Sequence, residues 1–248
     1  MVDTEFQSER RKKIETIGAD PVLNDLSRRW LARAQELGYS YNFDWLGLPI
    51  IQYPQDIVAM QELVWSLQPD LIIETGIARG GSAIFYSSLL ELNALCGGPA
   101  DARVVAVDVD IRQHNRVAIE AHPLSRRLTM IQGSSIDDAV VAEVRRHAAS
   151  RSRVLVCLDS NHTHDHVLAE LRAYAPLVTP GSYCVVFDTL INDLPAVAIG
   201  DRPWNKDANP LTALRAYMAE DGSFEIDAAR HGKLQVTVAS RGYLRRKG

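Results

Sequence analysis

The sequence of 248 residues has few cysteines, no long apolar run and no excess of positive charge. Its three cysteines, Cys96, Cys157 and Cys184, show no paired spacing, and the last two lie within apolar runs. Buried free thiols are therefore expected, and with them a reducing, cytoplasmic location. The N-terminal segment is charged, which is not typical of a signal peptide.

Two further classes of partner are disfavoured by what is missing. No apolar stretch reaches the roughly 18 residues that a membrane-spanning helix needs. The net charge of −4 offers no broad basic surface for nucleic acid. Basic runs occur only at 10–13 and 245–247, where they are typical of solvated termini. We expect neither a membrane span nor a nucleic-acid partner.

Short apolar runs that alternate with helical patterns organise the chain from residue 71 onward. The expected strands are 71–74, 103–108, 128–132, 153–159 and 183–188, and the expected helices are 55–67, 82–95, 112–122, 136–149, 166–175 and 210–219. Strands with continuous apolar sequence are buried on both faces, so this order predicts a parallel sheet covered by helices.

The C-terminal part breaks that alternation. Residues 224–227 and 234–239 are predicted as two strands joined by a short polar turn through His231 and Gly232, which forces antiparallel pairing. A sheet that finishes in this way is typical of class I methyltransferases, whereas dinucleotide-binding folds usually finish with parallel strands. The prediction is an α/β, Rossmann-like fold with a seven-stranded, mostly parallel sheet ending in an antiparallel hairpin.

The N-terminal part differs in composition from the rest. Residues 1 to about 40 are polar and helical in pattern, and 39–54 is rich in aromatic and turn residues. We interpret 39–54 as an ordered loop that packs on the core or lines a site. The predicted division is an N-terminal extension at 1–55 and a catalytic domain at 56–248. The polar helices are a candidate surface for homo-oligomer assembly.

A glycine-rich segment, Glu74–Ser82, directly follows the first predicted strand. Its glycines let the backbone approach a nucleotide-like ligand. The pattern Gly76-x-Ala78-x-x-Gly81 also fits a variant dinucleotide fingerprint. Glu74 favours S-adenosylmethionine, because its carboxylate can pair with the α-amino group of that molecule and would repel a pyrophosphate. The candidate cofactor residues of this segment are Glu74, Gly76, Arg79, Gly80, Gly81 and Ser82.

Further cofactor contacts are expected at the ends of the next strands. Asp108 ends the second strand, where an acid commonly accepts hydrogen bonds from ribose hydroxyls, and Asp110 is an alternative. Ser134 and Ser135 follow the third strand and are candidates to flank the adenine. They are equally candidates for the N-cap of the following helix.

A second group of polar residues follows the fourth and fifth strands, with Asp159, His162 and Asp188 as its main members. Two carboxylates at a site mouth suit magnesium, manganese or calcium, so Asp159 and Asp188 are candidate metal ligands, and Asp159 also borders the cofactor site. His162 is the candidate general base, since histidine titrates near neutral pH. Two interpretations of His164 and His166 stay open, as plain helix residues or as part of a three-histidine zinc site, and Asp165 is a candidate helix N-cap.

Several strings resemble the cephalosporin hydroxylase family, which includes the rhamnosyl O-methyltransferases. The resemblance covers about 41–244 and rests on Trp45–Asp56, Glu74–Ser82, Leu158–Val167, Pro180–Tyr183, Arg202–Trp204 and Asn209–Pro210. It implies a methyltransferase fold that binds S-adenosylmethionine. Related macrolide-sugar O-methyltransferases hold magnesium with an Asp after strand four and a Glu-Asp pair after strand five, and use a His three residues after the first Asp as base.

Asp159, His162 and Asp188 match that pattern, but Phe187 stands where the first carboxylate of the pair is expected. Water or Asn161 can replace the missing ligand, and base catalysis without metal is an alternative. Residues 189–209 form a long connection, which we interpret as a lid over the substrate. The predicted function is O-methylation of a hydroxyl of a sugar or glycosylated metabolite. The alternatives are a cofactor-binding helper in a hydroxylation system and a nicotinamide-dependent oxidoreductase.

Overall fold

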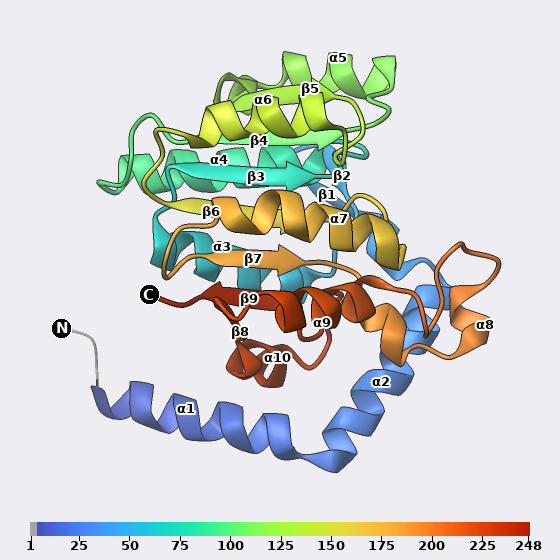
Figure 1. Ribbon diagram of the computed structural model, residues 1–248. Coiled ribbons are helices and arrows are strands. Elements are labelled where there is room, and N and C mark those ends of the chain that lie inside the picture. The colour runs from blue at the N-terminus through green and yellow to red at the C-terminus, as the bar shows by residue number, and fades with distance from the viewer. Residues whose placement is uncertain (1–3) are drawn as a thin grey trace.

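The computed structural model describes residues 4–248, and a single mixed sheet forms its centre (Figure 1). The strand order is β5-β4-β3-β6-β7-β9-β8. The first five of these run parallel, and β9 and β8 are antiparallel to their neighbours. The seven-stranded, mostly parallel sheet is therefore confirmed. Its strands are β3 Leu71–Thr75, β4 Arg103–Asp108, β5 Leu128–Gln132, β6 Val154–Leu158, β7 Tyr183–Val186, β8 Phe224–Ile226 and β9 Tyr243–Arg246.

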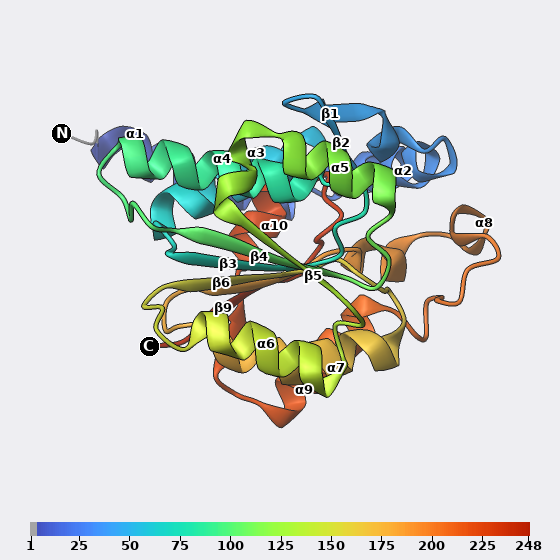
Figure 2. The same cartoon turned by 90° about the horizontal axis from the view of Figure 1, so that it is seen from above.

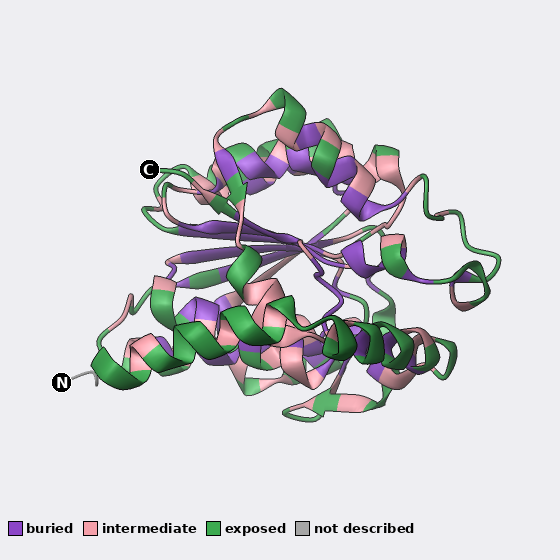
Figure 3. Ribbon diagram, turned by 90° about the horizontal axis from the view of Figure 1, so that it is seen from below, coloured by how far each residue is buried: buried purple, intermediate pink, exposed green. Residues whose placement is uncertain are grey.

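Helices cover both faces of the sheet (Figure 2). One face carries α3 Pro54–Leu67, α4 Gly81–Leu95 and α5 Gln113–Ala121, and the other carries α6 Asp138–Ala148, α7 His164–Tyr174 and α9 Pro210–Glu220. Successive strand residues point to opposite faces, so Ile72 belongs to the core under α3 and α4, whereas Ile73 belongs to the core under α6 and α7. All five residues of β3 and of β6 are buried, and Figure 3 shows the strands buried between the helical layers.

The last strand lies later in the chain than the sequence indicates. The prediction of a strand at 234–239 is wrong, because His231 and Gly232 lie in helix α10, Ala228–Leu234, and the pairing strand is β9. The backbone after α10 finds a different partner, since the buried carboxylate of Asp56 accepts hydrogen bonds from the Thr237 hydroxyl and the Val238 N–H. The Val238 N–H is bonded to Asp56 and its carbonyl to the Leu190 N–H, so neither group joins a strand ladder.

The N-terminal part contains the expected helices, α1 Thr4–Ala19 and α2 Pro21–Glu36, while residues 1–3 of that prediction lie outside the described residues. Asp20 caps α2, and its side chain accepts the N–H of Leu23. Figure 1 shows the two helices as a V beyond the β8 edge, with α10 between α1 and the sheet. No residue of α1 is buried. Within residues 4–248, no helix is long and apolar enough to cross a bilayer.

The aromatic segment is more regular than an ordered loop. It contains the turn η1 Tyr39–Asn42 and a two-stranded hairpin, β1 Phe43–Trp45 and β2 Leu48–Ile50. Leu46 and Gly47 connect the strands with φ values of 49° and 91°, as a two-residue hairpin turn requires. The hairpin packs on α4, where the rings of Trp45 and Phe85 lie 4.8 Å apart.

Candidate active site

A cavity of about 480 Å³ opens at the carboxyl ends of the parallel strands. In Figure 1 this is the edge toward which the arrows of β3 and β7 point, next to α8 Ala196–Ile199. Its walls come from α2, the segment around the hairpin, the glycine-rich loop, the ends of β6 and β7, and the segment 189–209. The predicted site residues that line it are Gly76, Arg79, Gly81, Ser82, Asp159, His162 and Asp188.

The glycines of the loop are required first by neighbouring protein. Gly76 has a φ of 95°, and a Cβ there would lie 2.2 Å from the Asp159 carbonyl oxygen. A Cβ on Gly81 would lie 2.3 Å from the carbonyl oxygen of Pro49 in the hairpin. Gly80 is backed by the Ile119 side chain and does not line the cavity. These glycines therefore let the loop pack against β6, α5 and the hairpin while its outer surface faces the cavity.

Glu74 lies beneath the cavity wall rather than in it. Only 2% of the residue is exposed, and burial raises the pKa of its carboxyl from 4.5 to about 8, against a hydrogen bond from Ser82 that lowers it. Its Oε2 has no hydrogen-bond partner within residues 4–248. An ionised carboxylate in this position needs a cation, since burying an unpaired charge is costly.

Asp108 makes structural contacts that the sequence reasoning did not predict. Its Oδ2 accepts the N–H groups of Ile77 at 2.8 Å and Ala78 at 3.0 Å, so this carboxylate holds the glycine-rich loop in place. Its Oδ1 accepts the N–H of Asp110. Asp108 does not line the cavity, and Asp110 is exposed and paired with Arg112.

Ser134 and Ser135 lie outside the cavity lining, and neither caps a helix. The N-cap of α6 is Asp137, whose side chain accepts the N–H of Ala139, so that alternative is wrong. The Ser135 hydroxyl instead lies 3.0 Å from His166 Nε2. Within residues 4–248, the Ser134 side chain makes no such contact with His166.

The three histidines of the loop do not converge. His164 Nδ1 bonds the Thr212 hydroxyl at 2.8 Å, and His166 lies beside Ser135 and the buried Glu170. His164 and His166 therefore bond residues outside the cluster around His162. Asp165 is inside the first turn of α7, and Thr163 occupies the N-cap position, so the N-cap prediction for Asp165 is wrong.

Asp159, His162 and Asp188 do converge. Each offers an oxygen or nitrogen atom, and these atoms lie within 4.8 Å of one another, the one such cluster found in residues 4–248. His162 Nε2 lies 2.9 Å from Asp188 Oδ2. Burial lowers the pKa of His162, but the adjacent Asp188 carboxylate outweighs it and raises that pKa above 6.5. Asp188 itself has a φ of 54°, a strained conformation for a residue other than glycine.

Burial, together with the charges of Asp188 and Glu74, raises the pKa of Asp159 well above its usual range. A cation beside Asp159 would offset that repulsion. Two carboxylates and an imidazole fit a divalent cation such as magnesium or manganese. The donor set of this cluster is therefore suited to the predicted metal.

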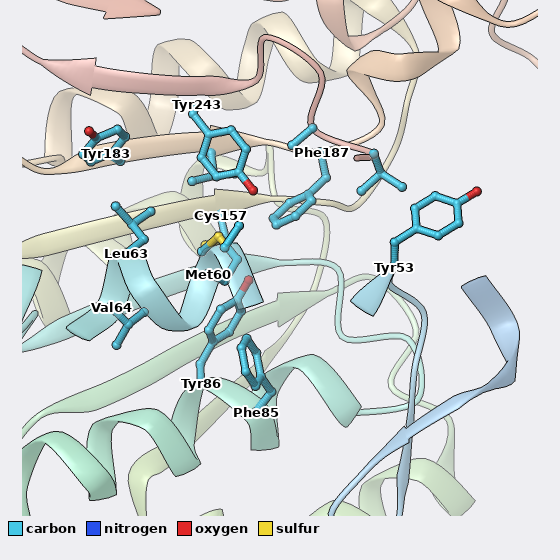
Figure 4. Packing of buried hydrophobic residues seen from close by; sticks show 14 of the residues in the cluster. Tyr53, Met60, Leu63, Val64, Phe85, Tyr86, Cys157, Tyr183, Phe187 and Tyr243 are labelled. Carbon is cyan, nitrogen blue, oxygen red and sulfur yellow. The ribbon is translucent and has the colours of Figure 1, made fainter. Parts of the chain in front are cut away.

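Neither Phe187 nor Asn161 supplies a ligand in place of the missing carboxylate. Phe187 is 2% exposed and packs in the core with Tyr53, Met60 and Cys157 (Figure 4). The Asn161 side-chain oxygen accepts both the N–H and the hydroxyl of Thr163, so it is already used.

Gln52 is a site residue that the sequence reasoning missed. Its Nε2 donates to Asp159 Oδ2 at 3.0 Å, and it lines the cavity. The residue lies in the string Trp45–Asp56, which supported the family resemblance, but nothing in its local pattern assigned it a role. Gln35 and Glu36 of α2 were missed as well, because only tertiary packing brings α2 to the cavity.

The segment 189–209 forms the outer wall of the cavity. It contains η4 Thr189–Asp193 and α8, and its lining residues are Ile191, Leu194, Ala198, Ile199, Arg202 and Trp204. The Trp204 ring meets the His162 ring edge-on at 4.8 Å, and the Arg202 guanidinium lies 5.4 Å from the Trp204 ring. Of the aromatic residues at 39–54, Tyr41 lines the cavity, whereas Tyr39 and Tyr53 stack on each other away from it.

Comparison with known proteins places this geometry in a family. The family described as rhamnosyl O-methyltransferase/CmcI matches residues 37–247. The rhamnosyl O-methyltransferase of Mycobacterium leprae is 31% identical over 207 residues, which is 82% of each chain. The enzyme of the same name from Mycobacterium tuberculosis is 31% identical over 205 residues, covering 81% of this chain and 76% of the relative.

Solved structures share the fold at lower identity. A structure described as cmcI-D160 Mg-SAM superposes with a TM-score of 0.58 at 19% identity, covering 84% of this chain and 78% of that one. A putative O-methyltransferase from Klebsiella pneumoniae gives 0.53 at 16% identity, covering 93% and 91%. The match over residues 37–247 and the mycobacterial relatives show that the chain belongs to the rhamnosyl O-methyltransferase/CmcI family of methyltransferases.

Proposed function

We propose that this chain is an S-adenosylmethionine-dependent O-methyltransferase that acts on a hydroxyl of a sugar or glycosylated metabolite. The observation that carries the proposal is the shared cavity, in which the glycine-rich loop and the cluster of Asp159, His162 and Asp188 face the same space. The rhamnosyl O-methyltransferase relatives support a sugar as the acceptor.

The residues beside the glycine-rich loop fit the methyl donor. Glu74 presents a buried oxygen that lacks a partner within residues 4–248, which suits the α-ammonium group of S-adenosylmethionine and not a pyrophosphate. When bound, this cofactor supplies an electrophilic methyl group. Gly76, Arg79, Gly81 and Ser82 line the adjoining wall, and Asp108 holds their loop in shape. Asp108 and Ser134 remain proposed contacts to the ribose and the adenine.

His162 is the proposed base. An alcohol must lose its proton as it attacks, and an imidazole with a pKa above 6.5 can take that proton near neutral pH. Nε2 bonds Asp188, so Nδ1 is the ring nitrogen left to accept the proton. The Asp188 carboxylate then stabilises the imidazolium, and the Trp204 ring limits rotation of the imidazole. Positioning of the hydroxyl against the methyl carbon supplies much of the rate.

Asp159 and Asp188 would hold a magnesium ion. A cation held there would polarise the acceptor hydroxyl and lower its pKa. Because Phe187 is in the core, these two carboxylates lack the third carboxylate expected from the resemblance. We therefore propose weak binding of the cation, with the proton still taken by His162.

Mass spectrometry tests the function directly. The purified chain, S-adenosylmethionine and a panel of rhamnosides and other glycosides are incubated together, and the expected product has gained one methylene group. A chain that binds S-adenosylhomocysteine but methylates nothing alone would instead support the helper role. Calorimetry with S-adenosylhomocysteine and NAD separates the third alternative, because binding of NAD alone would contradict the methyltransferase proposal.

We also propose the division into an extension at 1–55 and a catalytic domain at 56–248, with Ser40, Tyr41 and Gln52 of the extension completing the cavity.

We further propose self-association through the N-terminal helices. The exposed apolar residues Val22 on α2 and Leu37 directly after it support this assembly. Light scattering of the chain with and without Val22→Ser tests that assembly. The three free cysteines, two of them buried, support a cytoplasmic location.

A further inference from the structure

Gln52 lies between β2 and α3, and its carboxamide is oriented by one contact. The residue is 8% exposed, and its Nε2 donates to Asp159 Oδ2 at 3.0 Å. Because the NH₂ group faces Asp159, the oxygen Oε1 of the same planar carboxamide faces away from it. The chain thus aims a buried carbonyl oxygen at a fixed point.

That oxygen has no hydrogen-bond partner within residues 4–248. The Oε2 of Glu74 is also buried and also has no hydrogen-bond partner within residues 4–248. An unsatisfied buried acceptor is costly, and two of them in one region indicate that an outside donor completes the region. Both atoms are hydrogen-bond acceptors, so what each of them lacks is a donor.

Tertiary contacts bring these acceptors to one corner of the cavity. Asp159 directly follows β6 beside the end of β3, where its N–H bonds the Thr75 carbonyl at 2.9 Å. Ser82, which bonds Glu74, lines the cavity together with Gln52 and Asp159. Gln52 and Ser82 also face the same small hollow beside Phe85. Carboxylates and a carboxamide oxygen from three segments therefore adjoin one another.

We propose that Gln52 is a cofactor-binding residue whose Oε1 accepts a hydrogen bond from the α-ammonium group of S-adenosylmethionine. A primary ammonium carries three N–H donors, and Glu74, Gln52 and Asp159 offer one acceptor each. This inference rests on the proposed function, because it assigns a contact to the methyl donor. The same carboxamide holds Asp159, so it links the donor site to the cluster around His162.

Calorimetry with two ligands isolates the contact. The probes are S-adenosylhomocysteine and its analogue that lacks the α-amino group, each titrated into the wild type and into Gln52→Leu. We expect Gln52→Leu to weaken binding of S-adenosylhomocysteine by about tenfold or more, since the lost bond is to a charged donor. The same substitution is expected to change binding of the deaminated analogue less than about twofold, as a double-mutant cycle requires.

Gln55→Leu is the matched control. Gln55 also has a buried carboxamide oxygen without a partner within residues 4–248, but it lies on α3 and does not line the cavity. We expect its affinities for both ligands to equal those of the wild type. If Gln52→Leu unfolds in a thermal melt, Gln52→Met keeps the side-chain length and repeats the test.

Two results would overturn the inference while leaving the proposed function in place. One is an equal loss of affinity for both ligands, which assigns Gln52 to general packing, and the other is no loss for either. A wild-type chain that fails to bind S-adenosylhomocysteine contradicts the proposed function itself. The two failures are therefore distinguishable in one set of titrations.

Discussion

At the scale of single residues, His162 combines two side-chain contacts with burial. Asp188 bonds one ring nitrogen, Trp204 meets the ring edge-on, and burial removes most of the surrounding water. Opposing effects of burial and the carboxylate leave its pKa raised. Such a residue is oriented for proton transfer, whereas His164 and His166 use their ring nitrogens for packing contacts.

Replacing His162 with alanine tests its role as base. We expect His162→Ala to lower kcat by about 100-fold to 10,000-fold, which is the usual contribution of a general base. Affinity for S-adenosylhomocysteine, measured by calorimetry, should stay within about threefold, because His162 contacts Asp188 and Trp204 rather than Glu74 or the glycine-rich loop. The control is His164→Ala, which should keep most of the activity. Full activity of His162→Ala would show that another group takes the proton.

Phe187 explains why the missing carboxylate cannot simply be restored. The side chain is in the core and not in the cavity (Figure 4). Phe187→Glu should therefore lower the free energy of unfolding by more than about 3 kcal/mol, because it buries a charge without a partner. Urea denaturation measures this, and Phe187→Leu is the milder control. A stable Phe187→Glu variant with tighter magnesium binding would show that this side chain can reach the cluster.

At the scale of elements, the segment 189–209 separates the cavity from solvent. Trp204 extends from it to His162 and Arg202 lies against Trp204, while α8 turns Ala198 inward and leaves Val197 76% exposed. The segment therefore borders the cluster around His162, where we propose that the acceptor hydroxyl lies. Changes here are expected to affect the acceptor more than the methyl donor.

Trp204→Ala tests whether the segment 189–209 affects the acceptor more than the methyl donor. We expect the KM for the glycoside acceptor to rise by about tenfold, since an aromatic wall is lost from the pocket. Affinity for S-adenosylhomocysteine should be unchanged. Val197→Ala removes an exposed side chain from the same segment and should alter neither quantity. An equal loss of donor and acceptor binding in Trp204→Ala would contradict the assignment of the segment to the acceptor.

Asp56 joins α3 to the segment before β9, and burial raises its pKa from 3.8 to about 7. The folded state thus keeps a proton that the unfolded state loses between about pH 4 and 7, so Asp56 makes the fold less stable as pH rises through that range. The neutral variant Asp56→Asn lacks this dependence. The unfolding free energy of the wild type minus that of Asp56→Asn should fall by about 2–4 kcal/mol from pH 4 to 7. Urea denaturation at pH values from 4 to 7 measures this difference. A difference that stays constant over this range would contradict the prediction.

At the scale of the whole molecule, the two N-terminal helices contribute unequally. None of the residues of α1 is buried, whereas Ile50 and Tyr53 in the following segment are 1% and 0% exposed. The hairpin is therefore part of the core, and α1 rests on α10 at its surface. The catalytic unit is expected to tolerate loss of the first helix and not of the hairpin.

Deletion of residues 1–19 should shift Tm by no more than about 3 °C, because little apolar surface is exposed by it. Deletion of 1–53 should abolish the cooperative transition, since it removes the hairpin that packs on α4. Calorimetry of both truncations, together with methyl transfer by the shorter deletion, checks the contrast. A large loss of stability on removing α1 alone would assign that helix to the core.

Local patterning determined much of this protein. The spacing of apolar residues and the turn residues between them predicted the five parallel strands and their helices. The site residues Asp159, His162 and Asp188 were predicted because the strand ends of a parallel sheet meet at one edge. The strings that resemble the family indicate the reaction class without the tertiary structure. Boundaries of β4 and β5 agree with the structure residue for residue, since their apolar runs end abruptly.

Only the tertiary structure decided the remaining features. The apolar alternation at 234–239 predicts a strand, but the buried Asp56 bonds that backbone instead. No local pattern shows a partner so distant in the chain. Gln52 and the walls from α2 reach the site by the same kind of long-range packing. Alternation of apolar residues is a local property of the chain, whereas the partners of buried polar groups depend on how distant segments meet.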